Sequence, residues 1–124
     1  MIQTIDWQVS ETFKTSHYTM RGIRNKVAFI DAPFTDGREQ KYMWHFWGVV
    51  PEGEFTVIGV KEGSDELSPV LTRGSQSVWT YHSPGGQHAD EHLPSTMSVR
   101  ESGKWALLIY IGEEYFDQII VEVN

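Results

Sequence analysis

The side chains best suited to chemistry in this sequence are histidines, because cysteine is absent. Three of the five histidines lie in one polar stretch, "YHSPGGQHADEH", at residues 81–92, together with Asp90. Where thiolates are missing, imidazole and carboxylate groups are the ligands that zinc and similar divalent ions use. The stretch therefore offers a candidate metal site made of His82, His88, Asp90 and His92. His45 is a further possible ligand.

The same stretch also has the features of an ordinary polar loop. His88 and His92 are four residues apart, a spacing that aligns side chains only on a helix. Glycines at 85 and 86 and Pro94 favour a loop instead. "HADEH" also differs from the zinc-protease motif HExxH, in which glutamate follows the first histidine directly. We therefore favour an exposed loop and keep divalent-metal binding as the alternative function.

A second unusual segment is "KYMWHFWG" at residues 41–48, which carries four aromatic rings, a methionine and a histidine. In an extended chain, alternate side chains point to opposite faces. One face would then carry Tyr42, Trp44 and Phe46, and the other Met43, His45 and Trp47.

Two interpretations of this segment stay open. It is either a central strand whose second face is covered by a loop or by the N-terminal segment, or a platform that leaves one row of rings partly exposed. An exposed row would bind a sugar ring, a peptide or a partner protein. The candidate ligand-binding residues are Met43, Trp44, His45 and Trp47.

Motifs for most enzyme and nucleotide-binding classes are missing. The sequence has no Gly-x-Ser-x-Gly elbow, no phosphate-binding GxxxxGK[ST] and no GxGxxG. The clustered acids Glu91, Glu113 and Glu114 lie in predicted turns, where a facing pair of catalytic carboxylates is not expected. We expect a non-catalytic protein without a cofactor.

Composition supports a single folded domain over residues 1–124. Apolar residues make up 40% of the chain and charged residues 22%, as in globular proteins. The net charge of −7 argues against nucleic acid, which is bound through clustered lysines and arginines. No apolar stretch approaches the length of a transmembrane segment, and "MIQTIDWQVSETF" does not resemble a signal peptide, so a cytoplasmic location stays open.

Hydrophobic residues alternate with a period of two along most of the chain, which predicts an all-β protein. The clearest hairpin joins "KWALLIYI" to "YFDQIIVEV", with Trp105, Leu107, Ile109 and Ile111 on a face toward the core and Gln118, Glu122 and Asn124 in solvent. A second hairpin is predicted over residues 41–61 around "PEG". One or two strands with an irregularity near Gly74 are predicted in "VLTRGSQSVWTYH". About seven to nine short strands predict an antiparallel β-sandwich.

The order of several segments resembles an uncharacterised domain family of Gram-positive spore-forming bacteria, whose members are often exported proteins or lipoproteins. The family has a Trp-His strand, a His-Leu-Pro-Ser segment and a Gly-x-Trp strand before a valine-rich closing strand. The residues that carry the resemblance over about residues 22–124 are His45, His92, Leu93, Pro94, Ser95, Gly103 and Trp105. The resemblance implies an immunoglobulin-like sandwich and an extracellular or cell-envelope location, with no known activity. The function we expect is a binding module for an unknown protein or carbohydrate.

Overall fold

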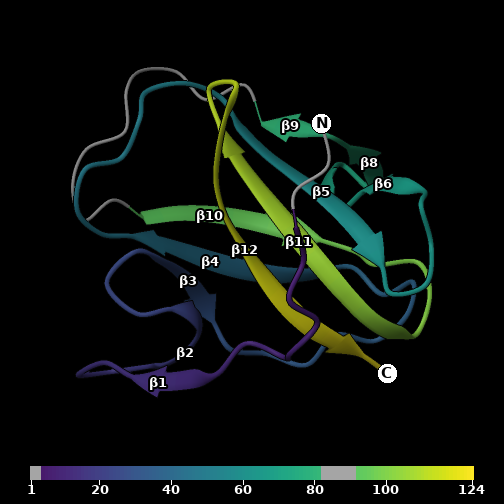
Figure 1. The fold of residues 1–124 in the computed structure, drawn as a ribbon, viewed down its shortest axis with the longest axis horizontal. Helices are drawn as coiled ribbons and strands as arrows, with labels where there is room; N and C mark the ends of the chain where they lie inside the picture. Colours follow the sequence, from purple (N-terminus) through teal and green to yellow (C-terminus); the bar gives the residue numbers. More distant parts are fainter. Residues whose placement is uncertain (1–3, 82–91) are drawn as a thin grey trace.

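The computed structural model describes residues 4–81 and 92–124, and this part of the chain is all-β, with twelve strands and no helix. The strands form two antiparallel sheets that pack face to face (Figure 1). The sheet of seven strands contains, in spatial order, β1 (Thr12–Lys14), β2 (Thr19–Ile23), β3 (Val27–Ile30), β4 (Gln40–Phe46), β10 (His92–Met97), β7 (Leu71–Arg73) and β8 (Gln76–Val78). The sheet of five contains β12 (Glu114–Val123), β11 (Gly103–Ile111), β5 (Phe55–Lys61) and β6 (Leu67–Pro69), with β9 (Thr80–Tyr81) also paired to β5.

The predicted all-β sandwich is therefore confirmed, although the strands outnumber the seven to nine expected. Several of the additional strands have only two or three residues, such as β1, β6 and β9. Strands this short contain too few alternations to be recognised by periodicity. The immunoglobulin-like subtype stays a prediction.

The main core lies between the two sheets and takes its side chains from one face of each. Trp105, Leu107, Ile109 and Ile111 of β11 are all buried, as the alternation predicts. They meet the inward row of β4, in which Trp44 has 0% of its surface exposed. The Trp44 indole N–H donates to the Ser95 hydroxyl over 3.0 Å, and that hydroxyl donates to the Tyr42 carbonyl over 2.8 Å. This buried pair of bonds fixes β10 beside β4 at the centre of the larger sheet.

The C-terminal hairpin is confirmed: β11 and β12 pair from Gly103 opposite Val123 to Ile111 opposite Glu114. The hairpin over residues 41–61 is wrong. Both edges of β4 are occupied, by β3 and β10, and β5 lies in the other sheet beside β11. The connection at residues 47–54 therefore crosses from one sheet to the other, a distance of roughly 10 Å.

Close backbone contact at Gly53 explains why this connection is not a simple turn. A side chain at Gly53 would place its Cβ 2.4 Å from the Gly112 Cα in the β11–β12 turn. The Gly112 N–H also donates to the Glu54 carbonyl over 2.8 Å. The irregularity expected near Gly74 is a tight turn between β7 and β8, in which Gly74 and Ser75 both have positive φ.

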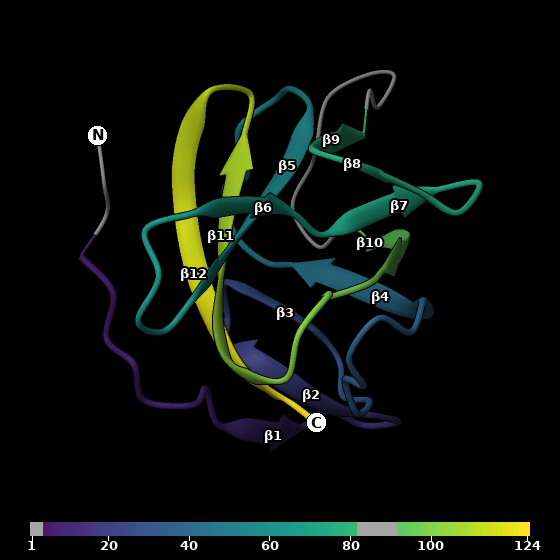
Figure 2. The same cartoon turned by 90° about the vertical axis from the view of Figure 1, so that its right-hand side faces the viewer.

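The outer face of the smaller sheet is less solvated than expected. Ala106, Leu108 and Ile120 are buried there, beneath the N-terminal residues Ile5 and Trp7. Figure 2 shows this N-terminal segment passing outside β11 and β12. Glu122 and Asn124 are exposed as predicted, whereas Gln118 is half-buried.

Candidate functional site

The outward row of β4 lies on the outer face of the seven-stranded sheet. Met43 and His45 of β4, and Trp47 directly after it, are half-buried there, so neither full burial nor full exposure describes them. Trp44 points the other way, into the core, and cannot contact a ligand at the surface in this structure. Trp44 is therefore removed from the candidate ligand-binding residues. Alternation along β4 places its side chain on the face opposite His45.

Rings from three neighbouring elements join this row and form a continuous surface, which we call the aromatic strip. Its members are Phe13, His17, Tyr18, His45, Trp47 and His92. The ring centroids of Phe13 and Trp47 are 6.2 Å apart, and those of Trp47 and His45 5.8 Å apart. Tyr18, which is 49% exposed, lies edge-on to His45 at 6.3 Å. The aromatic strip therefore combines apolar ring faces with imidazole and phenol groups that can form hydrogen bonds.

His45 and His92 are opposite each other on β4 and β10, and their ring centroids are 4.2 Å apart. Burial lowers the pKa of His45 below its ordinary value, and the neighbouring His92 lowers it further. Neutral His45 can both donate and accept a hydrogen bond.

Two small residues lie beside His45 on the neighbouring strands. Gly22, Ala28, His45 and His92 form one row across four adjacent strands. Gly22 has a φ of +146°, and a Cβ at this position would lie 2.5 Å from the Val27 carbonyl oxygen. Along this row, the two small residues on β2 and β3 are followed by the two imidazole side chains on β4 and β10.

The turn between β1 and β2 positions Tyr18. The Thr15 N–H donates to the Tyr18 carbonyl over 2.8 Å, and the Tyr18 N–H donates to the Thr15 hydroxyl over 3.2 Å. These bonds close the turn and hold the Tyr18 ring against His45. Sequence reasoning missed Phe13, His17 and Tyr18, because no local pattern shows that this turn folds against β4.

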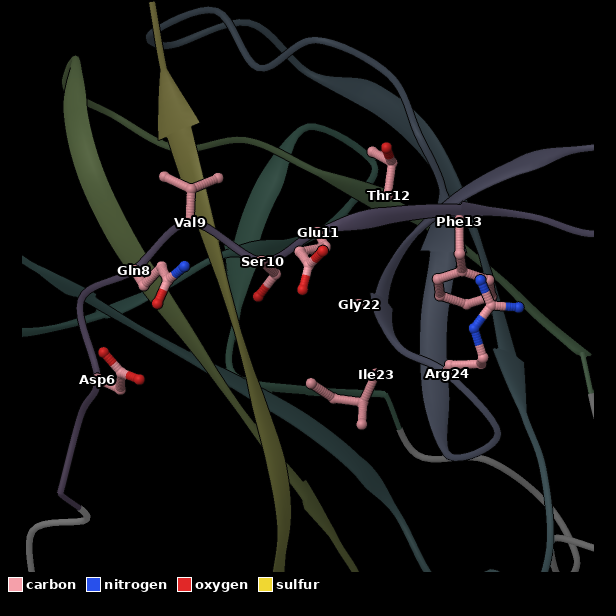
Figure 3. Close-up of a pocket in the computed structure, with 10 residues that line it drawn as sticks. All are labelled: Asp6, Gln8, Val9, Ser10, Glu11, Thr12, Phe13, Gly22, Ile23 and Arg24. Atoms are coloured by element: carbon pink, nitrogen blue, oxygen red, sulfur yellow. The ribbon is translucent and has the colours of Figure 1, made fainter.

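A pocket of about 400 Å³ with a mixed polar and apolar lining lies next to one end of the aromatic strip. Figure 3 shows its lining, which comes from the N-terminal segment with Asp6 and Glu11, from β1 with Phe13, and from the end of β2 and Arg24. The Arg24 guanidinium lies 4.7 Å from the centroid of the Phe13 ring. Phe13 is thus shared between the pocket and the aromatic strip.

Three of the candidate metal ligands, His82, His88 and Asp90, lie outside the described residues. His92 is described and stands beside His45. Over residues 4–81 and 92–124, no group of three or more His, Asp or Glu side chains is arranged to hold a metal ion. Within the same ranges, no helix is long and apolar enough to cross a membrane.

Comparison with known proteins gives a family and a structural relative. Residues 1–121 match the model of a domain of unknown function, DUF4871. The fold is similar to a crystal structure described as a "Putative Lipoprotein from Bacillus anthracis", with a TM-score of 0.86 and 30% sequence identity, over 97% of this chain and 88% of the other. No curated protein matches the chain.

Proposed function

The chain belongs to the DUF4871 family of domains of unknown function, and we propose that it is a non-catalytic carbohydrate-binding module of the cell envelope whose ligand surface is the aromatic strip. The observation that carries this proposal is the unbroken series of ring contacts from Phe13 through Trp47 and His45 to Tyr18. Rows of large rings normally complete their burial in a core, whereas these rings stop half-covered at the surface.

The chemistry of the aromatic strip suits a sugar better than a peptide. A pyranose ring presents an apolar face that stacks on aromatic rings, and hydroxyl groups at its edge that need donors and acceptors. Trp47 and Phe13 supply ring faces, while His45, His92 and the Tyr18 hydroxyl supply hydrogen-bonding groups. The alternative ligand of the same surface is a protein partner.

Two observations support an envelope location. The relative from Bacillus anthracis is described as a lipoprotein, and its match to this chain has 30% sequence identity and covers 97% of this chain. The sequence resemblance to exported proteins leads to the same expectation. A glycan of the envelope, such as peptidoglycan, is then the ligand to test first.

The test is co-sedimentation of the purified protein with insoluble bacterial peptidoglycan. We expect saturable binding that is lost in Trp47→Ala, because this change removes a ring from the aromatic strip. Trp79→Ala is the matched control, since Trp79 is 44% exposed outside the aromatic strip and its loss should leave binding unchanged. Failure of the parent protein to sediment, or equal loss in both variants, would contradict the proposal.

Divalent-metal binding is the second candidate function, favoured by the approach of His45 to His92. Two adjacent imidazoles can hold zinc, copper or nickel as a weak pair of ligands. Metal-free protein should then show a rise in melting temperature with zinc that His92→Gln abolishes. An unchanged melting temperature at millimolar zinc would exclude this function.

A further inference from the structure

A second concave surface lies on the outer face of the five-stranded sheet, away from the aromatic strip. It is a groove of about 550 Å³, within the usual range for small-molecule sites. Its apolar lining comes from the N-terminal segment and from β5, β6 and β11, and consists of Ile5, Trp7, Ile58, Val60, Leu67, Leu108 and Tyr110. The remaining lining residues, Gly63, Ser64 and Asp65, form the turn between β5 and β6.

The N-terminal segment forms one wall of this groove and is attached to β12 at two places. The Gln118 side-chain amide donates to the Thr4 carbonyl over 3.0 Å. The Ser10 N–H donates to the Ile120 carbonyl over 2.9 Å, and the Ile120 N–H donates to the Ser10 hydroxyl over 2.8 Å. Ile5 and Trp7 lie between these attachments and pack on the smaller apolar cluster of the sheet. The wall is therefore held in position before any ligand arrives.

The turn between β5 and β6 supplies the polar part of the groove lining. The Ser64 N–H donates to the Lys61 carbonyl over 3.0 Å, and the Glu66 N–H donates to the Ser64 hydroxyl over 3.0 Å, which fixes the turn. Asp65 is exposed at this turn and is the one carboxylate among the described lining residues. Among the residues that the structure describes, no lysine or arginine lines the groove.

We propose that this groove binds a small amphiphile that has an apolar alkyl or aryl body and a cationic ammonium head. The body would lie along the apolar lining of the groove, against Trp7, Ile58 and Tyr110, where it is removed from water. The head would meet the Asp65 carboxylate, and the Trp7 and Tyr110 rings add the aromatic surface that favours cations. An anionic head would face Asp65 without a counter-charge, on a protein whose net charge is −7. This site is separate from the aromatic strip and does not depend on the proposed function.

Isothermal titration calorimetry with n-alkylammonium ions tests the apolar part of the proposal. Affinity should rise about three- to fourfold for each methylene from butyl to octyl, the increase expected for burial of a CH₂ group. Octanoate, which has a similar chain and the opposite charge, should bind at least about tenfold more weakly than octylammonium. Equal binding of the two octyl compounds, or no binding of octylammonium, would overturn the proposal.

Asp65→Asn tests the role of the charge. Because Asp65 is exposed, the change should leave folding intact and weaken octylammonium binding about three- to fivefold, with no effect on neutral octanol. Asp6→Asn is the matched control, since Asp6 is an exposed acid of the N-terminal segment that lines the pocket beside Phe13 and not this groove. An equal effect of both changes would show non-specific attraction to an acidic protein and would refute the site.

Discussion

Trp44 and Trp47 lie three residues apart near the end of β4 and on opposite sides of the sheet, so replacing each by alanine separates core packing from surface exposure. Trp44 has 0% exposure, and its ring centroid lies 5.0 Å from that of Phe29 and 5.1 Å from that of Phe55. Trp47 is half-buried and contacts Phe13 and His45. The two substitutions remove the same atoms from the protein.

The expected costs differ several-fold. Trp44→Ala leaves a cavity in the core and should lower the free energy of unfolding by about 4–5 kcal/mol, at the upper end for large-to-small changes because two edge-to-face ring contacts are lost as well. Trp47→Ala removes a side chain that is only about half-buried, and should lower the free energy of unfolding by about 1 kcal/mol. For a domain of this size, the corresponding falls in melting temperature are about 15 °C and about 4 °C.

Urea denaturation followed by far-ultraviolet circular dichroism measures both values, and avoids fluorescence signals that change when tryptophan is removed. Trp105→Ala is a positive control, since Trp105 is 1% exposed and should behave like Trp44. If Trp47→Ala destabilises as much as Trp44→Ala, the outward row of β4 belongs to a core and the aromatic strip is not a surface.

Three further predictions concern the elements around the aromatic strip. Ser95→Ala leaves the buried Trp44 N–H without an acceptor and should cost about 1–3 kcal/mol in urea denaturation; a loss near zero would contradict the assigned hydrogen bond. Gly22→Ala should destabilise by about 1–3 kcal/mol or more through its contact with the Val27 carbonyl, whereas Gly74→Asn, in an open left-handed turn, should change little. The pKa of His45 in the folded protein lies below its ordinary value of 6.5, so His45 takes up a proton at higher pH in the unfolded chain than in the folded chain. The free energy of unfolding should therefore fall as the pH drops below about 6.5, and the fall should end below the pKa of His45 in the folded protein. His45→Gln should make this part of the pH–stability curve flatter in metal-free buffer, and identical curves would refute the shift.

Local alternation predicted the strands of this protein well. β4, β5, β11 and β12 follow from the period-two pattern of their residues, and the β11–β12 hairpin follows from its short turn. Pairing over longer distances did not follow. "PEG" between β4 and β5 has the composition of a hairpin turn, but both edges of β4 are taken by strands that a local pattern cannot show.

The candidate site was predicted only in part for the same reason. The alternation of β4 separated Met43, His45 and Trp47 from the core row, but could not decide which row faced outward. Tyr18 reaches His45 through a turn closed by Thr15, and His92 reaches it through pairing across more than forty residues. The cover that Ile5 and Trp7 give to the smaller sheet depends likewise on the path of the N-terminal segment.

Two-dimensional ¹H–¹⁵N NMR during titration with a soluble peptidoglycan fragment tests the proposed binding surface most directly. We predict that the amide and imidazole signals that move are those of Tyr18, His45, Trp47 and His92, and that signals around Trp79 and Asp65 stay in place. Shifts confined to the groove beneath Trp7, or no shifts at saturating fragment, would contradict carbohydrate binding by the aromatic strip.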